Sequence, residues 1–404
     1  MKNHNILLFA SGYKSSASAN GICARNLVRE FVHQGHNVYV IAVPHENEER
    51  MEIIDGAKVW FEKHDWWTRK LGYFHQNAKS CKGVILSNIF SLIRGVLLAP
   101  LYPNTSRGRV NRIVKLSRKL VALYDIDTVI GTCLPYCGIP AAVQLKKEYG
   151  NKLRVVTYHF DILSTPYNSK GLIYYYKQNR ILKAFNEELT IVDRVYLPET
   201  SIGLRFHKNI HYIGLPVYLP CASNNSLSYN FPKEFINISY VGSIGGNNRS
   251  ILPAVDLLRM MNKGGSQKYK LHLWGMVSDG KTMLDIERNS DIVEHHGLID
   301  NLEVHSLLMK SDYLLNISNA ILYRLLPSKM FAMFATGKPI INIVFNPDDC
   351  SIPFFKRYGN CLCVEMWKDV KDIDLSGLKE HISTNDAFDN YRPETIARLL
   401  LGNS

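Results

Sequence analysis

The amino-acid sequence predicts an α/β protein with two doubly wound parallel-sheet domains. Short apolar runs, typical of strands buried on both faces, alternate with amphipathic stretches at helical spacing. This alternation pauses in the polar, turn-rich residues 221–232 and then begins again. With 404 residues, the chain is also longer than a single hydrophobic core usually supports. We therefore expect one domain over residues 1–217, a second over 218–385, and a terminal helix within 386–404.

The first domain begins with a βαβ pattern. Residues 6–10 and 38–43 are apolar runs, and residues 22–34 between them have helical spacing. The loop before that helix, residues 11–21, is rich in small residues but lacks the G-x-G-x-x-G spacing of dinucleotide sites. The same reasoning predicts strands at 57–61, 127–133, 154–159, 194–197 and 210–213, and helices at 109–123, 139–149 and 174–189.

The second domain repeats this alternation. Its first strand, residues 237–241, leads into a glycine-rich loop, residues 242–249, that ends in Arg249. Ligands of open parallel sheets bind beyond the carboxyl ends of the strands, so this loop is a candidate anion site. Further strands are predicted at 269–274, 292–295, 313–317, 340–344 and 360–364, and helices at 251–261, 302–309 and 395–401.

One stretch of the second domain, residues 325–343, predicts a helix start with the chemistry of a phosphate site. Pro327 suits the first helical position, and Ser328 can cap free backbone N–H groups. Lys329 would oppose the helix dipole unless an anion is bound nearby. Free N–H groups with a lysine make a natural phosphate site. The alternative is a solvated surface lysine. Gly337 is expected to end this helix.

The formal net charge of +12 is concentrated in one segment. Nearly all of the excess lies between Lys63 and Lys119, where Asp65 is the only acidic residue. The segment includes the most apolar run of the chain, residues 83–102. This run is not expected to span a membrane, because Arg94 lies inside it and Pro100 ends it. We expect a helix at 84–98 packed on the sheet, with its basic and aromatic flank touching a membrane surface. No nucleic-acid-binding motif is present, so nucleic acid is not expected as a partner.

Cysteine usage indicates a reducing compartment. The eight cysteines are scattered without a paired framework or zinc-ligand spacing, which predicts reduced thiols and no metal site. The N-terminal apolar run, residues 6–10, is too short for a signal peptide. We expect a cytoplasmic protein, peripheral on the inner face of the plasma membrane.

Several motifs resemble those of one enzyme family. The segments YVGSIGGNNRS, HLWGM, VEHHGLI, SDYLLNIS and PSKMFAMFATGKPIIN resemble the retaining, GT-B-fold glycosyltransferases of the large bacterial surface-polysaccharide group (group 1, family 4-like). The resemblance implies two Rossmann-like domains facing across a cleft. Residues 1–217 would form the acceptor side, residues 218–385 would bind a nucleotide sugar, and the helix in 386–404 would return towards the first domain.

The resemblance also implies roles for individual residues. Arg249 and Lys329 would hold the donor diphosphate, and His159 would lie against the donor sugar and diphosphate. For His159 alone a structural histidine at a strand end is favoured, and Asp161 beside it brings the functional interpretation level with the structural one. The remaining donor contacts would come from Asn20, Gly21, Gly242, Gly245, Gly246, Gly275 and Ser328.

The sequence departs from the family pattern in one respect. The family has two glutamates eight positions apart before the GKP turn, and here these positions fall on Ala332 and near Arg324. Recognition of the nucleotide ribose by a carboxylate is therefore lost, unless Glu365, Asn316 or Asn319 substitutes. A non-catalytic or altered relative, such as a glycan-binding complex subunit, and a nucleotide-sugar epimerase are the alternative functions.

The implied reaction moves a sugar from a nucleotide-diphosphate donor, for which we expect a UDP-sugar, to a lipid-linked or cell-surface polysaccharide. The anomeric configuration would be retained. Arg249, Lys329 and helix N–H groups would stabilise the departing diphosphate, so no metal and no cofactor is expected. Closure of the two domains would exclude water and favour transfer over hydrolysis.

Overall fold

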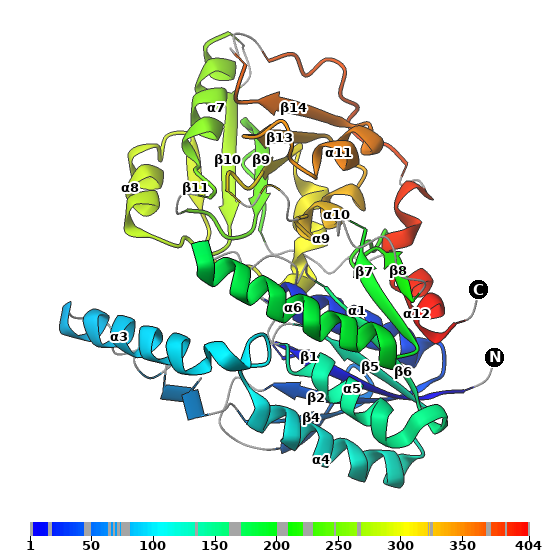
Figure 1. Cartoon of the computed structure of the whole chain (residues 1–404). Coiled ribbons are helices and arrows are strands. Elements are labelled where there is room, and N and C mark those ends of the chain that lie inside the picture. Colours follow the sequence, from blue (N-terminus) through cyan, green and yellow to red (C-terminus); the bar gives the residue numbers. More distant parts are fainter. Residues whose placement is uncertain are drawn as a thin grey trace. The chain divides into compact units, whose positions relative to one another are not determined.

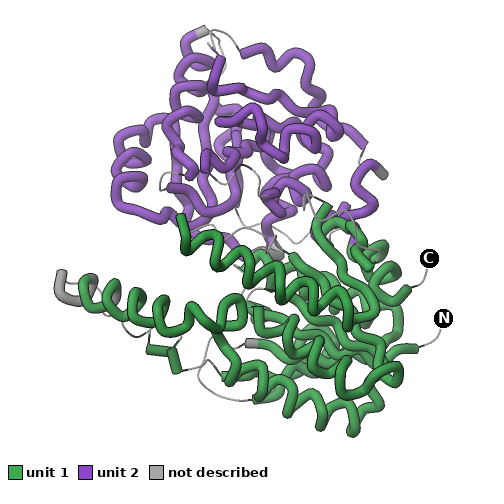
Figure 2. The backbone as a smooth tube through the Cα atoms, viewed as in Figure 1, with its two compact units in different colours: residues 1–216, 393–404 green, residues 217–392 purple. Residues whose placement is uncertain are grey.

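The structure is a computed structural model of the whole chain. It describes residues 3–14, 18–43, 50–63, 66–67, 69–70, 73, 81–133, 136–160, 171–199, 209–220, 229–245, 248–264, 268–321, 323, 326–368, 373–383 and 386–402. The chain forms two compact units (Figure 2). Unit 1 comprises Met1–Pro216 and Pro393–Ser404, and unit 2 comprises Val217–Arg392.

Unit 1 is built on an eight-stranded sheet in the order β3-β4-β2-β1-β5-β6-β7-β8. All neighbouring strands pair in parallel except β3, which is antiparallel to β4. The central strands are apolar throughout, as expected for a sheet covered on both faces. The strands are β1 (Asn5–Ser11), β2 (Asn37–Val43), β3 (Arg50–Ile54), β4 (Ala57–Phe61), β5 (Thr128–Thr132), β6 (Arg154–Tyr158), β7 (Arg194–Pro198) and β8 (Ile210–Ile213).

Helices cover this sheet and bring a distant part of the chain to it. The terminal helix α12 packs against α1. The Tyr196 hydroxyl on β7 donates to the Leu399 carbonyl at 2.6 Å, and the Arg154 guanidinium on β6 donates to that of Leu400 at 2.6 Å. The helices are α1 (Ala19–His33), α3 (Cys81–Leu98), η1 (Ala99–Leu101), α4 (Arg107–Tyr124), α5 (Gly138–Tyr149), η2 (Gly150–Lys152), α6 (Gly171–Ile191) and α12 (Pro393–Leu401).

The helix α3 does not pack on the sheet. In Figure 1 it extends away from the sheet of its own unit. Leu92 is 69% exposed and Val96 65% exposed, and the group of exposed apolar side chains on this helix is Ile85, Leu86, Ile89, Leu92, Ile93, Val96 and Leu97. The prediction that this helix would be buried against the sheet is therefore wrong. Apolar content predicted burial, but the periodicity of one helix cannot show whether another element covers it.

Unit 2 is built on a six-stranded, all-parallel sheet in the order β11-β10-β9-β12-β13-β14 (Figure 1). Its strands are β9 (Phe235–Val241), β10 (Lys268–Trp274), β11 (Val293–His295), β12 (Tyr313–Ile317), β13 (Ile340–Val344) and β14 (Cys361–Glu365). Its helices are α7 (Leu252–Gly264), α8 (Gly280–Arg288), α9 (Asn301–Lys310), α10 (Lys329–Phe334), α11 (Ile352–Tyr358) and η3 (Asp386–Tyr391).

The short helix α10 is anchored by aromatic stacking. Phe331 stacks on Tyr391 with ring centroids 3.9 Å apart, and Phe334 stacks on Phe388 at 4.7 Å and on Tyr358 at 4.8 Å. These apolar residues of α10 are fully buried, as their helical spacing predicted. The packing fixes the position of Lys329, the first residue of the helix.

The fold class predicted from the sequence is confirmed, because both units are α/β layers on parallel sheets. The edge strand β3 and the helices α8 and α11 were not predicted from the sequence. The helix α1 begins at Ala19, three residues before the predicted start at Ile22. Ser18 acts as its N-cap and accepts a hydrogen bond from the Gly21 N–H, which extends the helix into the small-residue stretch.

Candidate anion site

The structure brings Arg249 and Lys329 together, as expected from the two loops that carry them. The Nζ atom of Lys329 is buried and lies 3.9 Å from the centre of the Tyr240 ring. The Tyr240 hydroxyl donates to the carbonyl of Ser243 at 2.8 Å, and Arg249 Nη1 donates to the same carbonyl at 3.4 Å. Two basic side chains therefore meet at the carboxyl end of β9, against one aromatic ring.

The two cations repel one another in a desolvated position. Burial, followed by the nearby charge of Arg249, lowers the pKa of Lys329 well below its usual value. Within the described residues, no carboxylate pairs with Arg249 or Lys329, and the Lys329 ammonium has no hydrogen-bond acceptor. A buried cation without an anionic partner is costly, so this arrangement fits the binding of an anion.

Glycine at position 242 makes room for the lysine. Its φ of +137° is a conformation that other residues rarely adopt, and a Cβ there would lie 3.4 Å from Lys329 Nζ. Gly275, with a φ of +140°, approaches Gly242 so closely that a Cβ would lie 2.3 Å from its carbonyl oxygen. The loops after β9 and β10 are thus held together by backbone contact, which side chains would prevent.

The loop after β9 also approaches the start of α8. A Cβ at Gly245 would lie 2.5 Å from Asp279 Oδ2 and 2.5 Å from Ser278 Oγ. Asp279 is the N-cap of α8 and accepts a hydrogen bond from the Thr282 N–H at 2.9 Å. Gly245 is therefore required by packing. Gly246, also predicted to bind the donor, lies outside the described residues.

The predicted capping role of Ser328 is wrong. Ser328 occupies the N-cap position of α10, but its side chain makes no capping hydrogen bond. Its backbone is helical, whereas a capping serine normally has an extended conformation. The helix is six residues long, so its dipole is short, and the cationic side chains rather than the helix N-terminus dominate this site.

His159 directly follows β6 and has a buried partner of its own. Its Nε2 lies 2.7 Å from Glu188 Oε1 on α6, and Glu188 also accepts a hydrogen bond from Thr157. Burial alone would lower the pKa of His159, but Glu188 and the neighbouring Cys133 outweigh it and raise the pKa to about 10. The pairing gives His159 a structural partner at Nε2, while its buried Nδ1 has no hydrogen-bond partner among the described residues. A role of His159 at the donor sugar stays a prediction. Asp161 lies outside the described residues.

Asn20 and Gly21 lie in the first turn of α1 rather than in a loop. A Cβ at Gly21 would lie 2.2 Å from the Gly12 carbonyl oxygen, so Gly21 lets β1 and α1 approach closely. Gly12 itself has a φ of +62°. The small residues of this stretch serve the turn between strand and helix. A role of Asn20 and Gly21 at a phosphate stays a prediction.

The residues considered as substitutes for the missing glutamates differ in availability. Asn316 is buried in the sheet, where its side-chain amide donates to Asn342 Oδ1 at 2.7 Å. Glu365 forms an ion pair with Lys368. Asn319 is 3% exposed, and its Oδ1 accepts from Asn248 in the loop that carries Arg249, at 2.9 Å. Asn319 is therefore the substitute best linked to the cation pair.

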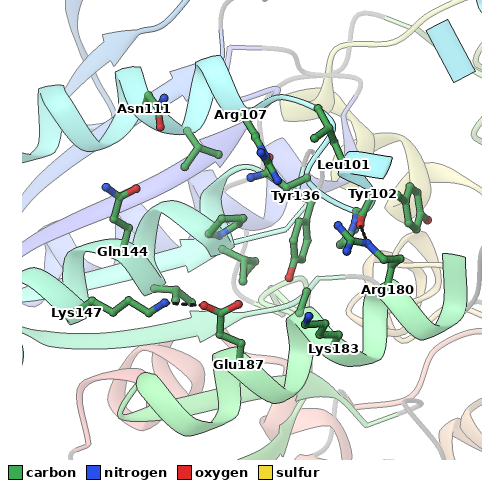
Figure 3. A pocket seen from close by; sticks show the side chains of 17 residues that line it. Leu101, Tyr102, Arg107, Asn111, Tyr136, Gln144, Lys147, Arg180, Lys183 and Glu187 are labelled. Atoms are coloured by element: carbon green, nitrogen blue, oxygen red, sulfur yellow. Dashed lines mark hydrogen bonds and ion pairs between the residues drawn. The ribbon is translucent and has the colours of Figure 1, made fainter. Parts of the chain in front are cut away.

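Unit 1 contains a separate cavity of about 470 Å³, which the sequence analysis did not identify. Figure 3 shows Tyr136 pointing into it between α4, α5 and α6. Lys147 pairs with Glu187 at 2.6 Å, and Arg180 donates to the Tyr102 carbonyl at 3.1 Å (Figure 3). The basic residues that line the cavity are Arg107, Lys147, Arg180 and Lys183. It could accommodate an anionic molecule with an apolar part.

Comparison with known proteins finds similarity in structure. No family model matches the sequence, and no curated protein matches it. Sucrose-phosphate synthase from Thermosynechococcus elongatus aligns over 99% of this chain and 98% of its own, at 13% identity and a TM-score of 0.61. A glycosyltransferase from Rickettsia africae aligns over 100% of both chains, at 13% identity and a TM-score of 0.55. Trehalose-6-phosphate synthase from Burkholderia multivorans covers 100% of this chain and 96% of its own, at 11% identity and a TM-score of 0.54.

The chain has the GT-B fold. The alignments extend over nearly the full length of these structures, so both units belong to the shared architecture. The resemblance of the sequence to GT-B glycosyltransferases is thus confirmed at the level of the fold. Among the described residues, no helix is long and apolar enough to cross a membrane.

Proposed function

We propose that this GT-B protein is a glycosyltransferase that moves a hexosyl or related group from a nucleotide-diphosphate sugar. The acceptor would be a lipid-linked or cell-surface polysaccharide precursor, and the anomeric configuration would be retained. The observation that supports this most strongly is the pair of Arg249 and Lys329, in which the Arg249 Nε and Lys329 Nζ atoms are buried and no carboxylate partner is present among the described residues. A diphosphate is an anion that can accept charge-assisted hydrogen bonds from both basic side chains.

In the proposed reaction, these cations stabilise the charge that develops on the departing diphosphate. Such charges act strongly in a desolvated site because no solvent reorganisation is needed. Burial and Arg249 lower the pKa of Lys329, and a diphosphate bound beside it would favour the protonated amine. We propose that these groups replace a metal ion in this step. Asn319 is our candidate for the ribose contact, and a UDP-sugar our candidate donor.

We further propose that unit 1 binds an anionic membrane surface. Leu92, Val96 and their neighbours form an exposed apolar face on α3. The 3₁₀ helix η1 continues α3 and contributes Leu101 to the basic cavity. Apolar side chains beside basic residues fit a peripheral helix on anionic lipid, where each basic group gains about 1 kcal/mol. A lipid-linked acceptor for capsule or exopolysaccharide would reach the enzyme there.

A nucleotide panel tests the donor site. Purified protein is heated with UDP, GDP, ADP and their sugar conjugates, and the preferred nucleotide should raise the unfolding temperature. Lys329→Ala should abolish the shift, while Lys263→Ala, an exposed lysine at the end of α7, should retain it. Nucleotide release from the preferred sugar with membrane acceptors then tests transfer. Binding without release would favour a non-catalytic relative, and product formation without acceptor would favour an epimerase.

Vesicle flotation tests the membrane surface. The protein should float with vesicles that contain phosphatidylglycerol, and the double variant Leu92→Glu with Val96→Glu should lose most of this binding. Leu123→Glu, at a 68% exposed position of α4 outside this face, is the matched control. If the double variant floats as well as the wild type, α3 does not form the membrane-binding surface.

A further inference from the structure

A group of side chains in unit 2, outside the anion site, has the composition of a metal site. His272 on β10, Glu294 on β11 and His296 just after it each offer one ligand atom, and these atoms lie within 4.8 Å of one another. The two strands are parallel, with His272 opposite Glu294. Alternate residues of a strand face the same side, so His296 joins them.

Asn237 fixes which nitrogen of His272 carries the proton. The Asn237 side-chain amide donates to the carbonyls of Pro232 and Phe235, both at 3.0 Å. Its oxygen therefore faces His272 Nε2, at 3.0 Å, and requires an N–H there. The lone pair of His272 is then on Nδ1, which points to His296 Nε2 at 3.0 Å.

This is how a ligating histidine is normally held. Such a histidine donates its second ring N–H to an oxygen acceptor, and the acceptor orients the ring. Two nitrogens bound to one tetrahedral zinc ion at about 2.0–2.1 Å would be about 3.3–3.4 Å apart, close to the observed separation. The His296 side chain is 10% exposed and that of Glu294 is 41% exposed, which leaves an entry path for an ion.

We propose that His272 Nδ1, His296 Nε2 and the Glu294 carboxylate bind one zinc ion, with a fourth position open to water. Two imidazoles and one carboxylate suit zinc. Three contacts compete with the ion, and the first is the hydrogen bond between His296 Nε2 and His272 Nδ1 at 3.0 Å. Lys270 Nζ lies 3.1 Å from Glu294 Oε2, and the Tyr229 hydroxyl lies 3.4 Å from His272 Nδ1.

A zinc ion here would clamp the edge of the sheet that supports the Gly275 loop. His295, between two of the ligands, hydrogen bonds through Nε2 to the Gly275 carbonyl at 2.9 Å. The Gly275 N–H donates to the Gly297 carbonyl at 2.6 Å. The ion would therefore stabilise β11 and the loop beside Gly242. It shares no ligand with the Arg249–Lys329 pair and does not depend on the proposed transferase function.

Zinc titration of the full-length protein tests this site. After removal of metals with a chelator, calorimetry should show one zinc ion bound per chain, and Co²⁺ should give the visible spectrum of a tetrahedral site. His296→Gln and Glu294→Gln should each weaken binding at least about tenfold. The control His305→Gln changes a half-buried histidine on α9 outside the group and should bind as the wild type.

Lys270→Gln separates metal binding from a merely structural role. Removing the competing ammonium should strengthen zinc binding several-fold. If Lys270 and Glu294 form only a structural ion pair, the substitution would leave zinc affinity unchanged. Circular dichroism confirms that each variant is folded. The proposal is overturned if no stoichiometric zinc binds, or if His296→Gln and His305→Gln bind it equally.

Discussion

Two buried basic groups of this protein differ in what surrounds them. His159 in unit 1 lies against Glu188, which is itself fully buried, so its charge is balanced within the protein. Lys329 in unit 2 lies beside another cation, Arg249, and an aromatic ring. The first arrangement raises the pKa of its basic group and the second lowers it. A charge-balanced pair stabilises the fold, whereas an uncompensated cation indicates a place for a ligand.

Breaking the charge-balanced pair of His159 and Glu188 should have the largest effect on stability. Glu188→Ala should lower the free energy of unfolding by about 3–5 kcal/mol, because it leaves the His159 charge buried without a partner. Glu187→Ala, next in sequence, removes an exposed pair with Lys147 and should cost about 0–1 kcal/mol. Urea unfolding of both variants measures the difference. Equal losses would mean that the His159–Glu188 pair is not a structural element.

Removing the uncompensated cation should act on binding instead. Lys329→Met should leave the free energy of unfolding unchanged or raise it, because an unpaired buried amine is replaced by an apolar side chain of similar length. It should abolish the nucleotide-dependent stabilisation, which for a ligand at 100 times its dissociation constant is about 2.7 kcal/mol. Denaturation with and without nucleotide checks both results. Strong destabilisation of the nucleotide-free variant would contradict the comparison.

The raised pKa of His159 predicts a pH dependence of stability. The folded-state pKa of about 10 lies above the unfolded value of about 6.5, so protonated His159 stabilises the fold. This contribution is complete below about pH 6.5 and is lost as the pH rises to about 10, with a slope of at most about 1.4 kcal/mol per pH unit. Unfolding measurements across this range should show the slope in the wild type and a flatter profile in Glu188→Ala.

A smaller effect should appear in the pH dependence of nucleotide binding. Diphosphate binding raises the lowered pKa of Lys329, so affinity should fall as the pH rises above the pKa of the free protein. Arg249→Gln removes a like charge and should move this fall to higher pH, although it also weakens binding overall. Titration calorimetry at several pH values measures the shift. An unchanged pH profile would show that the two cations do not interact.

The elements of the sheets could be predicted because their signals are local. The strands β8, β12 and β13 have the predicted bounds, because a short apolar run between turn residues can be recognised as a strand from the sequence alone. The edge strand β3 was missed because its residues alternate between partly buried and exposed, without a continuous apolar run. The cap at Ser18 was missed because the residues after it, Asn20 and Gly21, are weak helix formers.

Only some contacts of the candidate site could be predicted from the sequence. Arg249 and Lys329 could be paired from the sequence because both follow strands of one sheet, whose carboxyl ends share an edge. Glu188 could not be assigned to His159, because the two are 29 residues apart on a strand end and a helix. The group of His272, Glu294 and His296 likewise depends on the register of β10 with β11.

The sequence by itself determined the α/β alternation, the prediction of an anion site at two loops of one sheet and the apolar nature of α3. Tertiary structure decided which charges are balanced, which apolar surface stays exposed and which histidines meet. The reason is physical. Secondary structure follows from the spacing of neighbouring residues, whereas burial, pKa and ligand geometry depend on groups that only the packed chain brings together.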